Sequence, residues 1–165
     1  MASRVARDLG YPVLVCGDEI REEAKRRGLP PTPRNIGELM LKIREEEGRA
    51  IVASRLVPQI EAQDSNVVVV EGARNIEEID EFRKHYDVRI LAIHSSPKTR
   101  FNRLKSRGRS DDPDDWNDFM VRDRREVEVG IGRLVATADR MITNEGSVRE
   151  FKGKVNKLLR EMCSE

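Results

Sequence analysis

The chain has 165 residues, the size of one domain, and is long enough to bury about two-thirds of the surface that its unfolded form exposes. Its 31 lysines and arginines nearly cancel 30 aspartates and glutamates, so the charge balance argues against a nucleic acid polymer as partner. The two cysteines do not suggest a disulfide framework or a metal site, and no apolar run approaches the ~20 residues of a membrane span; a cytoplasmic protein is expected.

Short apolar runs alternate with helical patterns along the chain. Residues 1–10 are typical of the end of a helix, and a long helical segment, about residues 30–63, lies between the first two strands. Thr32 and Pro33 are placed to cap and begin a helix in that segment. Four apolar runs predict strands, at residues 12–16, 67–70, 88–94 and 140–143.

The four consecutive valines at 67–70 predict a strand that is covered on both faces, as in parallel sheets. Asn75 and Glu78 follow with the spacing of a helix capping box. Strands that alternate with helices predict an α/β fold, a mostly parallel sheet flanked by helices, in a single domain of residues 1–165. The segment 30–63 is then a helical insert on one face.

Three turns of the chain carry arginines. Arg21 follows the first strand and Arg74 follows the valine strand, so both guanidinium groups should reach the carboxyl edge of one sheet. The third turn is the charged loop that contains Arg109. Convergent arginines favour a phosphorylated ligand, which guanidinium groups hold through two hydrogen bonds, and Asp18 could orient it or hold a ribose hydroxyl.

These turns resemble those of known kinases. Gly17-Asp18-x-x-Arg21 resembles the acceptor-site turn of adenylate kinases, Glu71-Gly72-Ala73-Arg74 resembles their Asp-Gly-x-x-Arg turn, and Arg109-Ser110-Asp111-Asp112 is similar to the Arg-x-Asp-Asp of their lid. Residues 138–147 resemble the last strand and turn of dephospho-coenzyme A kinases. Overall the chain is most similar to an archaeal family of adenylate-kinase-related P-loop kinases, and this resemblance covers essentially all of its residues.

The resemblance implies an ATP-dependent phosphotransferase that uses ATP and magnesium. It places Asp18, Arg21, Gly72 and Arg74 at a small phosphorylated acceptor. It places Arg109, Arg122 and Arg125 over the donor, within a lid at about residues 106–126 that also carries Arg107, Asp111 and Asp112. Glu71 fills the place of a metal-orienting carboxylate, and Asn144 is expected near the donor base.

The chain differs from this family at its N-terminus. Such kinases begin with a strand and a G-x-x-x-x-G-K-[ST] loop that cradles the donor phosphates, and this motif does not occur in the 165 residues. The missing strand would lie between the strands at 67–70 and 89–93. We expect that the true start site lies upstream or that the sequence is truncated at its N-terminus, rather than that the protein is naturally shortened. The intact mass of the native protein tests this.

Three readings of the function follow. The first is a kinase of a nucleotide or nucleotide-like acceptor, complete only with the upstream segment. The second is a non-catalytic nucleotide-binding or regulatory module that kept the acceptor pocket, and the third is a scaffold in which the arginines are purely structural. The identity of the acceptor and the oligomeric state stay open at this point.

Overall fold

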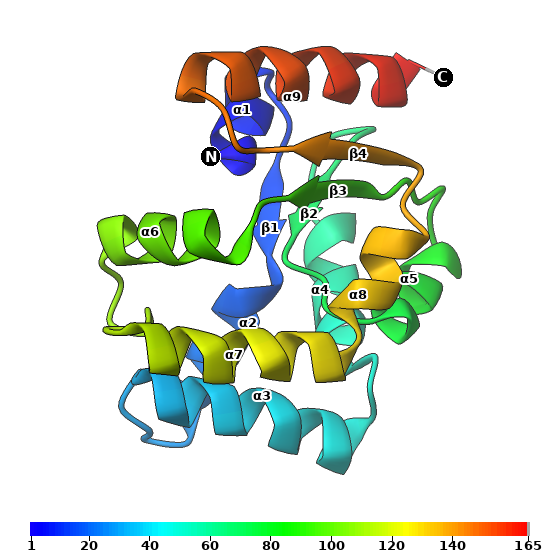
Figure 1. The fold of residues 1–165 in the computed structure, drawn as a ribbon. Coiled ribbons are helices and arrows are strands. Elements are labelled where there is room, and N and C mark those ends of the chain that lie inside the picture. The colour runs from blue at the N-terminus through cyan, green and yellow to red at the C-terminus, as the bar shows by residue number, and fades with distance from the viewer. Residues whose placement is uncertain (165) are drawn as a thin grey trace.

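The fold is seen in a computed structural model that describes residues 1–164 (Figure 1). The helices are α1 (Ala2–Asp8), α2 (Cys16–Arg26), α3 (Pro33–Glu47), α4 (Ile51–Glu61), α5 (Ile76–Arg83), α6 (Pro97–Arg107), α7 (Trp116–Val129), α8 (Ile131–Ala136) and α9 (Val148–Ser164). The strands are β1 (Val13–Val15), β2 (Val69–Glu71), β3 (Leu91–His94) and β4 (Arg140–Thr143). The predicted α/β class is confirmed, since short parallel strands are flanked by helices.

The predicted sheet is present as two separate parts. Strand β1 pairs in parallel with β2, with Val13 opposite Val69, and β3 pairs in parallel with β4, with Leu91 opposite Arg140. Within the described residues no strand joins β2 to β3. This gap is where the resemblance to P-loop kinases predicts the strand that is missing from this chain. The valines at 67–70 are accordingly half-buried rather than covered on both faces.

Side-chain caps define where several helices begin. The Thr32 hydroxyl accepts a hydrogen bond from the Asn35 backbone N–H at 3.2 Å, and Pro33 occupies the first turn of α3, as the sequence predicts. The Asn75 side chain accepts from the backbone N–H of Glu78 at 2.8 Å and so begins α5 directly after β2. These caps fix where the chain leaves each turn, and thereby the direction of α3 and α5.

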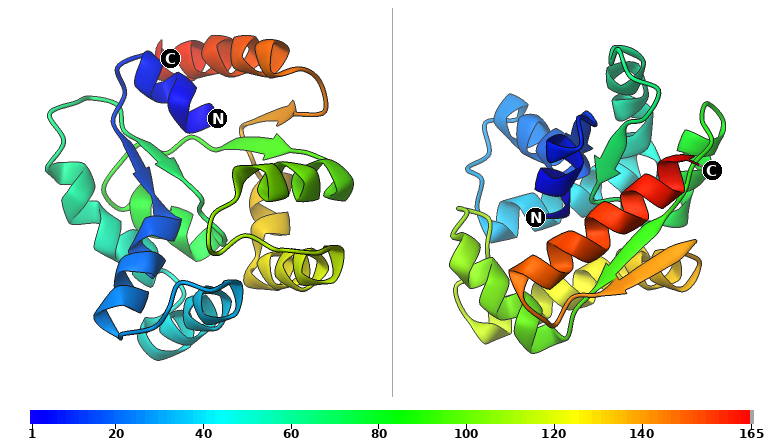
Figure 2. Two further views of the ribbon diagram at one scale, coloured as in Figure 1. Left: turned by 90° about the vertical axis from the view of Figure 1, so that its left-hand side faces the viewer. Right: turned by 90° about the horizontal axis from the view of Figure 1, so that it is seen from above.

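Two apolar cores hold the helices in place. One lies among α2, α3 and α4 and includes Ile20, Ile43 and Leu56. The other joins α1 to α9, with Ala6 and Val155 fully buried, and brings both ends of the chain to one side of the molecule (Figure 2). No helix of residues 1–164 is both long and apolar enough to cross a membrane.

Candidate functional site

A cavity of about 450 Å³ lies between α2, α3 and α7, at the carboxyl ends of β1 and β2. This volume falls in the range of small-molecule sites, about 300–1,000 Å³. Cys16 and Gly17, which follow β1, and Gly72, which follows β2, form its inner end. Helix α3 contributes one wall, and α7 with the preceding loop contributes the other. We call this space the arginine cavity.

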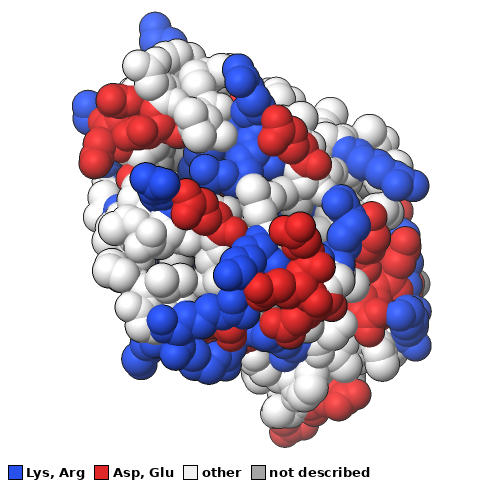
Figure 3. Space-filling view, turned by 90° about the horizontal axis from the view of Figure 1, so that it is seen from below, with Lys and Arg blue, Asp and Glu red and all other residues white. Residues whose placement is uncertain are grey.

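The lining of the arginine cavity carries more positive than negative charge. Its six arginines are Arg21, Arg34, Arg44, Arg74, Arg122 and Arg125, and its four acidic residues are Glu38, Asp111, Asp118 and Glu126. Two carboxylates behind the lining, Glu78 and Asp112, pair with Arg44 and Arg122, so not all of this positive charge is free to meet a ligand anion. On the face shown in Figure 3, acidic and basic side chains are interspersed.

The structure brings half of the sequence-predicted site residues to the cavity. The predicted residues that line it are Arg21, Gly72, Arg74, Asp111, Arg122 and Arg125. The predicted residues that lie outside its lining are Asp18, Glu71, Arg107, Arg109, Asp112 and Asn144. The arginines of the first two turns do converge, because β1 and β2 are adjacent and parallel.

The outlying residues near the strand ends have partners of their own. Asp18 accepts from Arg21 Nη1 at 2.5 Å, while its side chain is 65% exposed. Glu71 accepts a hydrogen bond from the hydroxyl of Ser3, which holds α1 against the end of β2. The backbone carbonyl of Asn144 accepts from the hydroxyl of Ser95 at 2.8 Å. In this structure each of these residues contacts another group of the chain.

The first part of the predicted lid forms a compact charged turn before α7, and its remainder, residues 116–126, belongs to that helix. The carboxylate of Asp112 accepts hydrogen bonds from the Arg107 side chain and, at 2.9 Å, from the backbone N–H of Arg109. Burial raises the pKa of Asp112, but the hydrogen bond from Arg107 and the charge of Arg122 outweigh burial and hold that pKa below its usual range. Asp112 therefore stays ionised and organises the turn that presents Asp111 to the cavity.

Acidic side chains from the lid and α7 already engage the cavity arginines. Asp111, only 5% exposed, accepts from Arg21 Nη2 at 3.0 Å. Glu126 lies 3.6 Å from Arg74 and 3.3 Å from Arg122. Burial raises the pKa of Glu126, but the charges of Arg74 and Arg122 outweigh it and hold the pKa below its usual range. A ligand anion would thus compete with these carboxylates for the arginines.

Arg125 differs from the other cavity arginines. Its side chain makes no hydrogen bond or ion pair with any residue of the described chain, although it lines the cavity. Its guanidinium group lies directly against the backbone of Gly37, where a side-chain Cβ would overlap it. A glycine in α3 thus allows α7 to bring an uncompensated cation to the cavity.

Sequence reasoning missed Gly37, Cys16 and Arg44. Only Gly37 carried a signal, as an isolated glycine inside a helical pattern. Cys16 is buried at the inner end of the cavity, and burial raises the pKa of its thiol to about 12. Arg44 is 93% hidden from solvent. It donates from Nη2 to Oε1 of the fully buried Glu78 at 2.5 Å, a long-range pair that no local pattern reveals.

The described part of the chain lacks the usual residues for binding a donor nucleotide and a metal ion. Among residues 1–164 no three His, Cys, Asp or Glu side chains group as a metal site, and the sequence contains no G-x-x-x-x-G-K-[ST] loop. A cavity lined by arginines can hold an anion such as a phosphate, whereas the sequence lacks the loop that would hold the phosphates of a donor nucleotide.

Comparison with known proteins defines the class. A family model described as "AAA domain" matches residues 1–119, so the chain is a P-loop kinase-like protein of that class. Within it, the chain belongs to the UPF0200 family. It is 42% identical to a UPF0200 protein of Hyperthermus butylicus over 163 residues, which cover 99% of this chain and 88% of the relative. It is 41% identical to one of Methanocaldococcus jannaschii over 165 residues, with 99% and 84% covered.

Proposed function

We propose that the chain forms the acceptor-binding part of an ATP-dependent phosphotransferase that acts on a nucleotide or nucleotide-like phosphate. The observation that carries the proposal is the arginine cavity, where six arginines face four acidic residues at the carboxyl ends of two parallel strands. Ligands of open α/β sheets bind at this edge. The class of P-loop kinase-like proteins supports the same reading.

Each part of the cavity has a role in this proposal. Arg21 and Arg74, at the inner end, hold the acceptor phosphate, and Arg122 and Arg125 on α7 neutralise charge on the group that is transferred. Catalysis then consists of positioning and charge neutralisation around an in-line displacement, which requires no strong base. Arg109, Glu71 and Asn144, outside the cavity lining, stay candidates for the donor side.

A second function is favoured by one specific observation. Because the sequence contains no phosphate-cradling G-x-x-x-x-G-K-[ST] loop, the chain could bind a phosphorylated ligand without catalysing transfer. It would then be a nucleotide-binding or regulatory module. The two functions share the acceptor cavity and differ in whether ATP binds.

Calorimetric titration of the native protein, with its upstream segment where the intact mass shows one, separates the functions. We expect nucleoside 5′-monophosphates to bind, with affinities that fall as salt is raised, because the contacts are between ions. If ATP with magnesium also binds and phosphate appears on the monophosphate, the protein is a kinase. If the monophosphate binds and ATP does not, the binding module is correct. If neither binds, the cavity arginines are structural and the proposal fails.

A further inference from the structure

Glu78 is a fully buried carboxylate behind the arginine cavity. Its side chain is 0% exposed, and glutamates are almost never fully buried unless they are paired. One carboxylate oxygen accepts from Nη2 of Arg44 at 2.5 Å, and the other accepts from the backbone N–H of Arg74 at 2.7 Å. Glu78 therefore joins a cavity-lining arginine of α3 to the backbone of an arginine at the strand ends.

Capping of α5 does not account for this carboxylate. The Asn75 side chain caps the helix by accepting from the backbone N–H of Glu78 at 2.8 Å. In a capping box the glutamate returns to the backbone N–H of the cap residue itself, whereas Glu78 reaches one residue further, to Arg74. The Glu78 carboxylate therefore acts on the turn that precedes the helix.

Stability alone does not account for the buried pair of Glu78 and Arg44 either. Arg44 is only 7% exposed and also donates from Nη1 to the backbone carbonyl of Met40 at 2.8 Å. The free energy of taking two ions out of water can exceed the gain from their attraction, and apolar side chains of similar volume are often equally stable. The pair is better explained by the group that it holds, which is the Arg74 backbone.

The direction of the Arg74 side chain depends on that backbone. Arg74 follows a turn in which Gly72 has φ +95°, a left-handed conformation that favours glycine. Its Nη1 donates to the Gly72 carbonyl at 3.1 Å, and its Nη2 lies 3.6 Å from Glu126. Because Glu78 holds the backbone N–H, the Cα–Cβ bond of Arg74 keeps a fixed direction. A guanidinium group that holds a phosphate through two hydrogen bonds needs such support.

We propose that Glu78 is a positioning residue for phosphate binding: with Arg44 as its counter-ion, it fixes the Arg74 backbone so that the guanidinium group meets the ligand phosphate. The inference rests on the proposed function, because it takes Arg74 as a contact of the acceptor phosphate. Glu78 is fully buried and touches no ligand itself. Its loss should therefore weaken binding through Arg74 alone.

Two double variants that differ in one hydrogen-bond acceptor test this. Both carry Arg44→Met, so that no buried charge is left unpaired, and they combine it with either Glu78→Gln or Glu78→Leu. Only glutamine offers an oxygen to the Arg74 N–H. In calorimetry with adenosine 5′-monophosphate, the glutamine variant should bind within about threefold of the native affinity and the leucine variant about tenfold more weakly. Equal affinities in the two variants would overturn the inference. Glu78→Ala replaces Glu78→Leu if urea denaturation shows that the leucine variant is unfolded.

The same two variants made in an Arg74→Ala background separate positioning from a general structural role. Alanine keeps the backbone N–H at this position but has no guanidinium group to direct. NMR titration with the monophosphate should therefore give the glutamine and leucine variants equal affinities in this background. A ratio that stays near tenfold would show that Glu78 supports the cavity as a whole, and would overturn the inference. If the native protein does not bind the monophosphate, the proposed function itself fails.

Discussion

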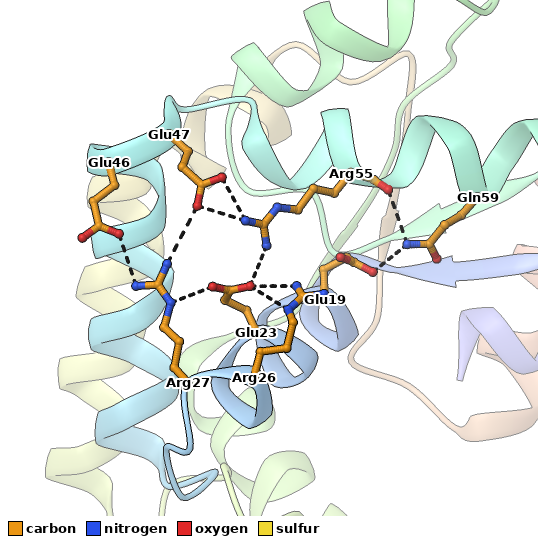
Figure 4. Close-up of polar contacts among 8 residues, drawn as sticks. All are labelled: Glu19, Glu23, Arg26, Arg27, Glu46, Glu47, Arg55 and Gln59. Atoms are coloured by element: carbon orange, nitrogen blue, oxygen red, sulfur yellow. Dashed lines mark hydrogen bonds and ion pairs between the residues drawn. The ribbon is translucent and has the colours of Figure 1, made fainter.

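Two arginine-rich clusters draw residues from α2 and α3, and they differ in charge balance. The first, which we call the Glu23 network, joins eight residues in Figure 4: Glu19, Glu23, Arg26, Arg27, Glu46, Glu47, Arg55 and Gln59. In it four carboxylates meet three arginines, and Glu23 alone accepts from Arg27 at 2.6 Å, Arg26 at 2.7 Å and Arg55 at 2.9 Å. The second is the arginine cavity, where six arginines meet four acidic residues.

The difference shows what separates a structural cluster from a binding site. In the Glu23 network every guanidinium group has a carboxylate, and acidic groups are in excess, so an anion would be repelled. In the arginine cavity Arg125 has no partner among the described residues, and space remains for a ligand. Arginine content alone therefore does not identify the site; an arginine without a partner beside a cavity does.

The largest expected effect is on stability and comes from the Glu23 network. Glu23→Gln removes the charge that three arginines share, and should lower the free energy of unfolding by about 2 kcal/mol. Urea denaturation measures this. Glu38→Gln, in the exposed Arg34–Glu38 pair, is the control and should cost under about 1 kcal/mol. Binding of a monophosphate should not change in Glu23→Gln, and a loss would mean that the network belongs to the site.

The same network predicts how stability depends on pH. Hydrogen bonds from Arg27, Arg26 and Arg55 lower the pKa of Glu23 to about 2, from 4.5. Because the folded state lowers this pKa, the stabilisation is complete above pH 4.5 and is lost as pH falls toward 2. Melting temperatures measured down this range should fall less steeply for Glu23→Gln than for the native protein. Parallel curves would assign the acid sensitivity to other carboxylates.

A smaller effect, on binding, is expected at Gly37. In Gly37→Ala the new methyl group displaces the Arg125 guanidinium from α3, and monophosphate affinity should fall about tenfold. Gly153→Ala in α9 is the matched control, because no atom lies within 4 Å of its added Cβ. Both variants should gain up to about 1 kcal/mol of helix stability. Equal affinities in the two variants would remove Arg125 from the site.

The smallest expected effect has the opposite sign. Asp111→Asn removes the carboxylate that holds Arg21 at 3.0 Å and competes with a ligand phosphate. Monophosphate affinity should rise about threefold, because the phosphate no longer has to displace a carboxylate from Arg21. Calorimetry on the variant and on the native protein shows whether the monophosphate affinity rises or falls. A decrease would mean that Asp111 positions Arg21 for the ligand rather than competing with it.

Sequence patterns predicted the strand-end features and missed those made by packing. Arg21 and Arg74 could be placed together because parallel strands end at one edge, and Asn75 was recognisable as a cap from its spacing to Glu78. The Arg44–Glu78 pair joins residues 34 positions apart and depends on how α3 packs, which no local pattern encodes. The division into two sheets depends on strand pairing and could only be anticipated through the family resemblance.

The contact between Gly37 and Arg125 is a second case of this kind. It depends on how closely α7 approaches α3, and the sequence shows only that a glycine interrupts a helical pattern. Asn144 and Glu71 illustrate the converse, because both lie at strand ends yet engage the protein's own groups in this structure. Position at a strand end brought Arg21 and Arg74 to the cavity, but it did not bring Glu71 or Asn144 there.

The most direct measurement compares monophosphate binding to Arg74→Ala and Arg26→Ala. Each variant removes one arginine, the first from the arginine cavity and the second from the Glu23 network. The account predicts an affinity about 10- to 100-fold weaker in Arg74→Ala and unchanged in Arg26→Ala. Native affinity in Arg74→Ala, or an equal loss in both variants, would contradict the assignment of the cavity as the phosphate site.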